Sequence, residues 1–183
     1  MIYTDDYDGP YLKKFAIPFY HTKIENWDIK RLKLDEIFDA HKHHMTTDGD
    51  QLTDYDTNRQ YHFLLEGILM DDLIRVKKVF GIEKQIRINS AWFQQYNRAH
   101  SHHVHNHGFG GFSSVLYLRF DPAYHRPTTF VAPFLNNFDG NVFEYIPPEV
   151  EEGDLIVFPT SLAHYVPVNT SDVERRILSM NMN

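Results

Sequence analysis

Hydrophobic residues follow two different periods along this chain. In the first half they recur at helical spacing, in one rough stripe after Asn26 and in a longer one between Thr57 and Phe80. From Gln85 onward they alternate with polar residues in short runs, which is the period of strands. The pattern therefore predicts helices in the first half and a β-rich second half.

The first predicted helix begins near Asn26 or Asp28, either of which can cap it, and ends near residues 41–44. Its expected apolar stripe consists of Ile29, Leu32, Ile37 and Phe38. The second predicted helix spans about 57–80, and Gly81 stands just beyond it, where glycine commonly ends a helix. We expect this second helix to contribute packing and no chemistry.

Two other stretches of the first half do not read as helix. The apolar run 15–20 contains Pro18, so we expect at most an edge strand there. The stretch 48–56 is polar and rich in turn residues, and we expect it to form a loop between the helices.

Seven strand-like segments follow in the second half. They are residues 85–93, 109–120, 128–132, 142–146, 154–158, 165–168 and 174–182. Helices followed by many short strands predict helices packed outside a β-sandwich or jelly roll. Because 183 residues suit one domain, we expect a single domain, 1–183, with a mostly helical part over 1–84 and a β core over 85–183.

Charge and cysteine content narrow the function. The formal net charge is −7 and no dense Lys/Arg stripe is present, so nucleic acid is not an expected partner. The chain has no cysteine, which leaves imidazole, carboxylate and water as ligands for any metal ion. The N-terminus lacks a signal-peptide pattern and no apolar run reaches membrane-spanning length, so we expect a cytoplasmic protein without a membrane partner.

A histidine cluster is the strongest chemical signal. Five of the twelve histidines lie within residues 100–107, and His164 lies far downstream. On a strand, His105 and His107 would share one face about 6.6 Å apart. Two imidazoles at that spacing can converge on one ion at about 2.0–2.1 Å each. A third ligand has to come from another strand, and His164 is the candidate.

Two other interpretations of these histidines remain open. The run 100–107 could be a solvated loop that binds metal without specificity. His164 taken alone could be a hydrogen-bonded histidine of the core.

Three sequence blocks carry a family resemblance. The blocks are His105-Asn-His107 with the following Ser113 and Tyr117, the segment 152–164 ending in His164, and the segment 166–181 containing Arg175. Over about 89–183 the chain resembles the double-stranded β-helix of iron(II)- and 2-oxoglutarate-dependent oxygenases. Within that superfamily it is similar to a branch with an H-x-H metal motif.

The resemblance implies a fold, an activity and a site. The implied fold is mainly β, a jelly-roll or cupin-like double-stranded β-helix core packed by N-terminal helices. The implied enzyme is an Fe(II)/2-oxoglutarate-dependent dioxygenase, a hydroxylase that couples 2-oxoglutarate decarboxylation to substrate oxidation with O2. It also implies that His105, His107 and His164 bind the metal, and that Arg175 binds the far carboxylate of 2-oxoglutarate.

Two tyrosines are further cosubstrate candidates under this resemblance. A phenol at Tyr117 or at Tyr96 could donate a hydrogen bond to the cosubstrate. Both have a core-packing alternative, because aromatic residues make up 15% of the chain.

The chain departs from the family pattern at the second metal ligand. Most of the superfamily has a carboxylate where His107 stands, and Asp121 or Glu144 could complete the site in its place. With His107 as ligand, the protein ligands would all be neutral. His103-Val-His105 is a competing frame, although the spacing to Ser113 and Tyr117 favours His105 and His107.

The position of the cosubstrate arginine also has a rival. Arg176 is adjacent to Arg175, and Arg175 could instead pair with Glu174 at the surface. Strand alternation would place Ile177 and Ser179 on the face of Arg175. The fork of an arginine suits a carboxylate, because it donates two parallel hydrogen bonds.

Two other functions fit the histidine cluster. One is a three-histidine, cupin-like dioxygenase that does not use 2-oxoglutarate, and the other is a non-catalytic module that binds a metal. The sequence leaves the substrate open, either a small molecule or a protein side chain, and it leaves the oligomeric state open, a homo-oligomer included.

Overall fold

Two antiparallel sheets and two helices make up the structure, a computed structural model that describes residues 17–57, 60–135 and 139–183. In chain order the elements are β1 (Tyr20–Lys23), α1 (Trp27–His41), the 3-10 helix η1 (Lys42–His44), β2 (Thr46–Asp48), β3 (Gln51–Thr53), α2 (His62–Phe80), β4 (Ile88–Tyr96), β5 (His102–His105), β6 (Phe112–Arg119), β7 (Thr129–Leu135), β8 (Val142–Tyr145), β9 (Asp154–Pro159), β10 (His164–Val166) and β11 (Arg175–Met182). Neither α-helix is long and apolar enough to cross a membrane.

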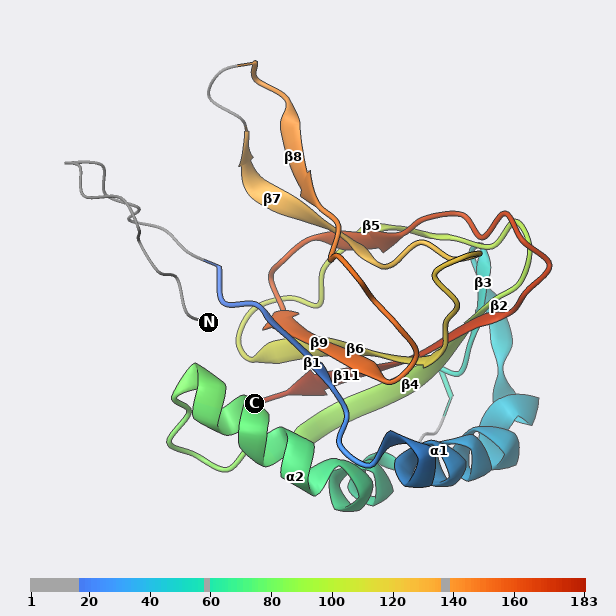
Figure 1. Cartoon of the computed structure of the whole chain (residues 1–183), viewed down its shortest axis with the longest axis vertical. Helices are drawn as coiled ribbons and strands as arrows, with labels where there is room; N and C mark the ends of the chain where they lie inside the picture. Colours follow the sequence, from blue (N-terminus) through green and yellow to red (C-terminus); the bar gives the residue numbers. More distant parts are fainter. Residues whose placement is uncertain (1–16, 58–59, 136–138) are drawn as a thin grey trace.

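The sheets form two layers, with the helices outside. The larger sheet has seven strands in the order β1-β9-β6-β11-β4-β3-β2, and the smaller has four in the order β5-β10-β7-β8. The helices α1 and α2 cover one face of the larger sheet, and the smaller sheet lies over the other face (Figure 1). The predicted arrangement of helices outside a jelly-roll core is confirmed.

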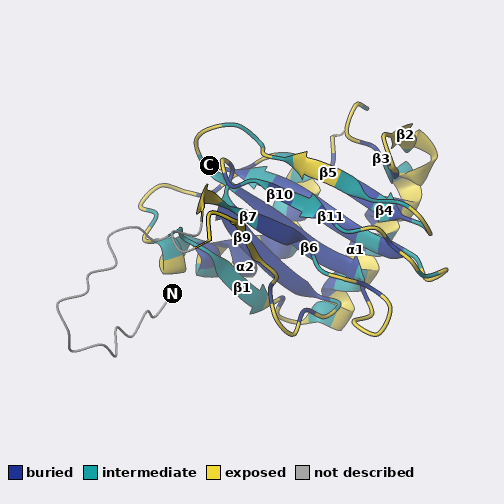
Figure 2. Cartoon of the chain, turned by 90° about the horizontal axis from the view of Figure 1, so that it is seen from above, coloured by how far each residue is buried: buried dark blue, intermediate teal, exposed yellow. Residues whose placement is uncertain are grey.

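Side-chain alternation on the central strands separates two cores. On β11, Leu178 and Met180 pack with the helices in one buried cluster. Ile177 belongs to a second cluster, between the two sheets. The central strands of the larger sheet are buried on both faces, and Figure 2 shows them as the dark interior of the molecule. A residue on β11 therefore faces either the helices or the space between the sheets, depending on whether its number is even or odd.

The first helix is present, but its buried stripe differs from the prediction. Ile29 and Leu32 are 61% and 60% exposed, whereas Lys30 and Leu34 are buried. Lys30 is buried because its Nζ lies 2.5 Å from a carboxylate oxygen of Asp72, a buried residue of α2. An ion pair between the helices thus takes a position that an apolar pattern cannot predict.

The second helix begins at His62, later than the predicted residue 57, and ends at Phe80. Gly81 ends it as expected, with a left-handed φ of 63° and its N–H directed to carbonyls of the last turn. The predicted loop 48–56 was wrong in part, because strands β2 and β3 pair there as a hairpin. These strands are short and polar, so they carry no hydrophobic alternation.

Each of the seven predicted strands has a counterpart, namely β4, β6, β7, β8, β9, β10 and β11. Strand β5 is not among those seven segments; it lies inside the histidine run, where a strand was considered only for His105 and His107. Residues 15 and 16 of the predicted edge strand 15–20 lie outside the described residues, residues 17–19 are not in a strand, and β1 begins at Tyr20, at one edge of the larger sheet. Strand pairing along the centre of the larger sheet, with Asn181 opposite Ser113, sets the positions of the residues described next.

Candidate metal centre

Strand pairing brings His164 beside His105. His105 is the last residue of β5, His164 is the first of β10, and the two are opposite each other in the antiparallel pair. His107 lies beyond the end of β5, where its N–H donates to the carbonyl of Thr160 at 2.9 Å. The expected placement of His105 and His107 on one straight strand was therefore wrong, and a bend after β5 brings the two rings together.

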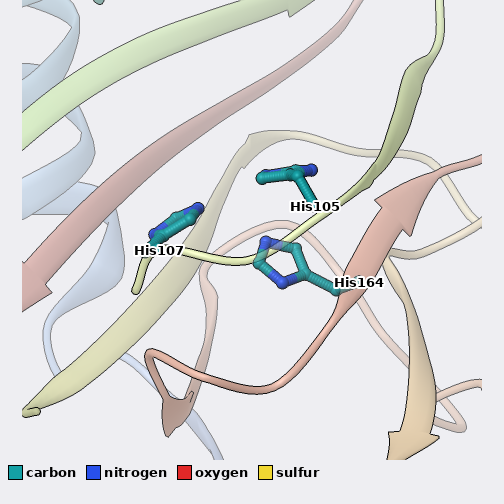
Figure 3. A group of neighbouring side chains, drawn as sticks. All are labelled: His105, His107 and His164. Carbon is teal, nitrogen blue, oxygen red and sulfur yellow. The ribbon is translucent and has the colours of Figure 1, made fainter. Parts of the chain in front are cut away.

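The three imidazoles form one compact group. Each offers a nitrogen within 4.8 Å of the others. Their ring centroids are 4.4 Å apart for His105 and His164, 5.0 Å for His107 and His164, and 5.3 Å for His105 and His107. The rings face a shared space (Figure 3). Among the described residues, His105, His107 and His164 form the group of ligand side chains that could hold a metal ion.

Hydrogen bonds orient each of the three rings in the same way. His105 and His164 have Nδ1 at 2.8 and 2.9 Å from backbone carbonyl oxygens two residues earlier in the chain. Nδ1 of His107 lies 2.8 Å from the amide oxygen of Asn181. Since an oxygen of this kind only accepts, each Nδ1 carries the proton and each Nε2 keeps a lone pair for a ligand bond.

Burial keeps these imidazoles neutral. It lowers the pKa of His105 and of His107, in the latter case against the opposing effect of the bond to Asn181. Burial, with the neighbouring His105, lowers the pKa of His164 to about 3. A neutral imidazole is the form that binds metal, so the donor set fits a divalent ion at neutral pH.

The carboxylate alternatives lie elsewhere. Asp121 is exposed and accepts a hydrogen bond from the backbone N–H of Ala123 in its own turn. Glu144 is exposed on β8 and accepts from the hydroxyl of Tyr165. His103, from the competing frame, is exposed as well. None of the three belongs to the group of described residues that could share an ion.

His102 is an additional histidine beside the group. Its ring stacks on that of His105, with centroids 4.0 Å apart. Gln94, which is buried, has Nε2 at 3.2 Å from His102 Nδ1 and accepts a hydrogen bond from Ser179 at 2.6 Å. Burial and three neighbouring histidines lower the pKa of His102 to about 3. His102, Gln94 and Ser179 thus form a series of hydrogen-bonded side chains that was not predicted. Strand alternation had placed only Ser179, on the same face of β11 as Arg175.

Arg175 lies between the two sheets. It is 1% exposed, and its guanidinium carbon lies 5.2 Å from the ring centre of Tyr96 and 5.6 Å from that of Tyr117. Its Nη2 donates to the hydroxyl of Thr128 at 3.1 Å. Its Nε and Nη1 are buried and have no hydrogen-bond partner among the described residues. Burial lowers the pKa of this guanidinium, because it penalises the charged form. Keeping the charge at this position therefore costs free energy of folding.

The two tyrosines differ in their hydrogen bonding. The hydroxyl of Tyr117 accepts from the backbone N–H of Thr128 at 3.0 Å. The hydroxyl of Tyr96 is buried, and no partner for it lies among the described residues. Burial raises the pKa of Tyr96, so the phenol keeps its proton and can donate. Two guanidinium donors and one phenol without partners fit an anion such as a carboxylate.

Arg176 lies on the opposite face of β11. Its guanidinium carbon is 3.5 Å from the ring centre of Phe38 on α1. It also pairs with Asp35 and with Glu174. The surface pair expected as an alternative for Arg175 is therefore formed by Arg176 instead.

A glycine-rich loop follows His107. Gly108, Gly110 and Gly111 have φ values of 87°, 89° and 91°, a region that L side chains rarely adopt. A Cβ on Gly111 would lie 2.3 Å from the carbonyl oxygen of Met182, so this position requires glycine for space as well. The loop can thus turn from β5 into β6 close to the end of β11.

Comparisons with known proteins identify a family and a fold for this chain. A family model described as "Putative 2OG-Fe(II) oxygenase" matches residues 90–181. The chain is similar to a prolyl-4-hydroxylase from Pseudomonas putida, at 16% identity over 92% of this chain and 93% of that chain, with a TM-score of 0.58. Comparison with curated proteins gave no match.

Two further solved structures are similar in fold. The non-heme α-ketoglutarate-dependent epimerase SnoN from nogalamycin biosynthesis is 12% identical over 91% of this chain and 78% of that chain, with a TM-score of 0.69. HygX from Streptomyces hygroscopicus, solved with nickel and 2-oxoglutarate bound, is 11% identical over 91% and 83%, with a TM-score of 0.64. At these identities the likeness shows the fold, which is the double-stranded β-helix expected from the sequence.

Proposed function

Because this chain belongs to the family of 2OG-Fe(II) oxygenases, enzymes that use Fe(II) and 2-oxoglutarate, we propose that it is a hydroxylase whose metal is held by His105, His107 and His164. The three neutral imidazoles would hold the ion, since each offers a nitrogen within 4.8 Å of the others. When bound, Fe(II) and 2-oxoglutarate supply the oxidising chemistry, which couples decarboxylation of the cosubstrate to oxidation of the substrate by O2. The protein orients the reactants and excludes water.

The buried guanidinium of Arg175 carries this proposal. Arg175 is a buried cation between two sheets, and two of its donors have no partner in the part of the chain that the structure describes, which is costly unless an anion binds there. The far carboxylate of 2-oxoglutarate fits, because an arginine fork donates two parallel bonds to a carboxylate. We assign Arg175 to that carboxylate, with Tyr96 as a second donor and Tyr117 as part of the wall that holds the guanidinium.

The other two functions leave Arg175 without a role. A three-histidine dioxygenase that does not use 2-oxoglutarate needs no buried cation between the two sheets. A non-catalytic metal module needs none either, and replacing a buried charge with an apolar residue is often neutral or stabilising. The histidine group alone is compatible with all three functions, so Arg175 discriminates among them.

The substrate class and the location are part of the proposal. A small molecule and a protein side chain both remain candidate substrates, and the similar structures include a prolyl-4-hydroxylase and an enzyme of nogalamycin biosynthesis. We propose a cytoplasmic location, because a chain without cysteine suits a reducing compartment. A homo-oligomer is compatible with these features.

The test is a spectrum followed by a product assay. Anaerobic addition of Fe(II) and 2-oxoglutarate to the full chain should give the weak visible charge-transfer band of a chelated cosubstrate. Admission of air should then give succinate, measured against a sample without 2-oxoglutarate. If neither the band nor succinate forms, the chain is not a 2-oxoglutarate-dependent oxygenase with this site.

A further inference from the structure

A hydrogen-bonded pair of side chains lies behind His107. The hydroxyl of Ser113 donates to the amide oxygen of Asn181 at 2.7 Å. Nδ1 of His107 is 2.8 Å from the same oxygen and 2.9 Å from the hydroxyl of Ser113. Ser113 is fully buried, and the two residues are opposite each other on β6 and β11. The contact is therefore built into the centre of the larger sheet.

The orientation of the Asn181 amide determines which nitrogen of His107 carries the proton. Its oxygen faces His107 and accepts from Ser113, while its Nδ2 lies 3.3 Å from the hydroxyl of Ser90, which can accept a hydrogen bond. An amide oxygen can only accept, so the imidazole must donate from Nδ1. Nε2 is then the nitrogen with a free lone pair, on the side of the ring away from Asn181.

His107 differs in this respect from the other two histidines. The acceptors behind His105 and His164 are backbone carbonyls, which no substitution removes. His107 depends on two side chains, and Trp92 packs against its ring with centroids 5.2 Å apart. Its tautomer and its orientation are therefore set by particular residues of the sequence.

We propose that Ser113 and Asn181 are positioning residues that hold His107 as its Nδ1–H tautomer, with Nε2 directed to the metal. This rests on the proposed function, in which His107 is a ligand. A carboxylate at this position needs no such device, because either oxygen can bind. An imidazole binds through one bare nitrogen only, so replacing a carboxylate with histidine requires an acceptor behind the ring.

The chain supplies a matched control for this proposal. Ser114 is adjacent to Ser113, equally buried and on the opposite face of β6, where its hydroxyl has no partner among the described residues. Ser113→Ala and Ser114→Ala remove the same atom from neighbouring buried positions. Asn181→Leu removes the acceptor at similar size, whereas Asn181→Asp keeps one.

The first measurement is the affinity of each folded variant for Co(II) alone, by calorimetric titration. Loss of a partner of this kind typically weakens metal binding by about 10–100-fold. We expect a loss in that range for Asn181→Leu, a smaller loss for Ser113→Ala, and affinity close to that of the wild type for Ser114→Ala. Asn181→Asp should restore binding, since its carboxylate accepts from the same Nδ1–H. Equal affinities for Ser113→Ala and Ser114→Ala, with no loss in Asn181→Leu, would overturn the proposal.

The second measurement reads the tautomer directly and needs no metal. Long-range nitrogen–proton NMR of the metal-free protein should show His107 protonated at Nδ1 in the wild type and in Asn181→Asp. Asn181→Leu should show a mixture of the two tautomers. Protonation at Nε2 in the wild type would overturn the inference. If the wild type has the Nδ1–H tautomer but binds no Co(II), the metal-site proposal fails while the tautomer assignment holds.

Discussion

Replacement of Arg175 by methionine is the sharpest test of cosubstrate binding. The wild-type guanidinium donates to the hydroxyl of Thr128 at 3.1 Å, and its Nε and Nη1 are buried without a partner among the described residues. Methionine fills similar space without charge. The variant should keep the metal site and lose the donors available to the far carboxylate of 2-oxoglutarate.

The expected loss follows from the burial of the site. Truncating one partner of a buried, hydrogen-bonded charge pair costs about 2–5 kcal/mol, part of which is the penalty of leaving the other charge unpaired. At about 1.4 kcal/mol per factor of ten, the affinity for 2-oxoglutarate should fall by roughly 30- to 4,000-fold. The lower limit applies if water replaces some of the lost bonds.

The assay is calorimetric titration of 2-oxoglutarate into Ni(II)-loaded protein, with Arg176→Met as the matched control. Arg176 is the next residue along β11, but it packs on Phe38 of α1 and so should not affect 2-oxoglutarate binding. Affinity for Ni(II) itself should be the same in both variants. An equal fall in 2-oxoglutarate affinity in the two variants, or none in Arg175→Met, would refute the assignment.

The order of the two variants should be reversed for stability: Arg176→Met, which keeps 2-oxoglutarate affinity, should lose the more stability. Arg176→Met loses two ion pairs and a ring contact. Arg175→Met removes a buried cation, two of whose donors find no partner within residues 17–57, 60–135 and 139–183, and replacing such a charge with an apolar residue is often neutral or stabilising. In the absence of 2-oxoglutarate, the melting temperature of Arg175→Met should therefore not fall below that of Arg176→Met.

Three other outcomes are expected. His164→Ala should weaken Co(II) binding by more than the roughly 100-fold that loss of an outer partner costs, whereas His103→Ala, at an exposed position, should leave it unchanged. Gly110→Ala should lower the free energy of unfolding by about 1–2 kcal/mol, the cost of left-handed backbone for an L residue, because a Cβ has room there. Gly111→Ala should lower it by more, because a Cβ at that position would also collide with the carbonyl oxygen of Met182. Equal melting temperatures of the two variants would contradict this. Burial alone would raise the pKa of Asp154, but hydrogen bonds from an imidazole and a backbone N–H outweigh it and hold the pKa below its usual value. Its stabilising contribution is thus present above the unfolded-state pKa of about 3.9 and is lost as the pH falls through the lower folded-state value, so the difference in melting temperature between wild type and Asp154→Asn should shrink in acid.

Local pattern predicted most of the elements, because period two and period 3.6 are properties of neighbouring residues. It failed where stability came from a distant partner. Lys30 is buried because Asp72 lies opposite it on another helix, and no stripe on α1 contains that information. The hairpin formed by β2 and β3 was missed for the same reason, since it is held at one edge of the larger sheet by the pairing of β3 with β4.

Local pattern likewise predicted part of the arrangement around the histidines, and contacts between distant strands supplied the rest. The run 100–107 marked the metal chemistry, and alternation on β11 placed Ile177 and Ser179 on the face of Arg175. Spacing alone did not predict the bend after β5 that brings His107 to the other two rings. Nor did it identify Asn181 as the acceptor for His107, because that contact joins two strands far apart in the chain.

By itself the sequence determined which chemistry was available: imidazoles in place of thiolates, strands in the second half, and an arginine at the start of the last strand. These are properties of residue type and of local periodicity, which every conformation of the chain shares. Only the tertiary structure decided which imidazoles meet, which arginine faces the space between the sheets, and which nitrogen of His107 is left free. Those outcomes depend on pairing between strands distant in sequence, on the hydrogen bonds made across that pairing, and on the cost of burying a charge between two sheets.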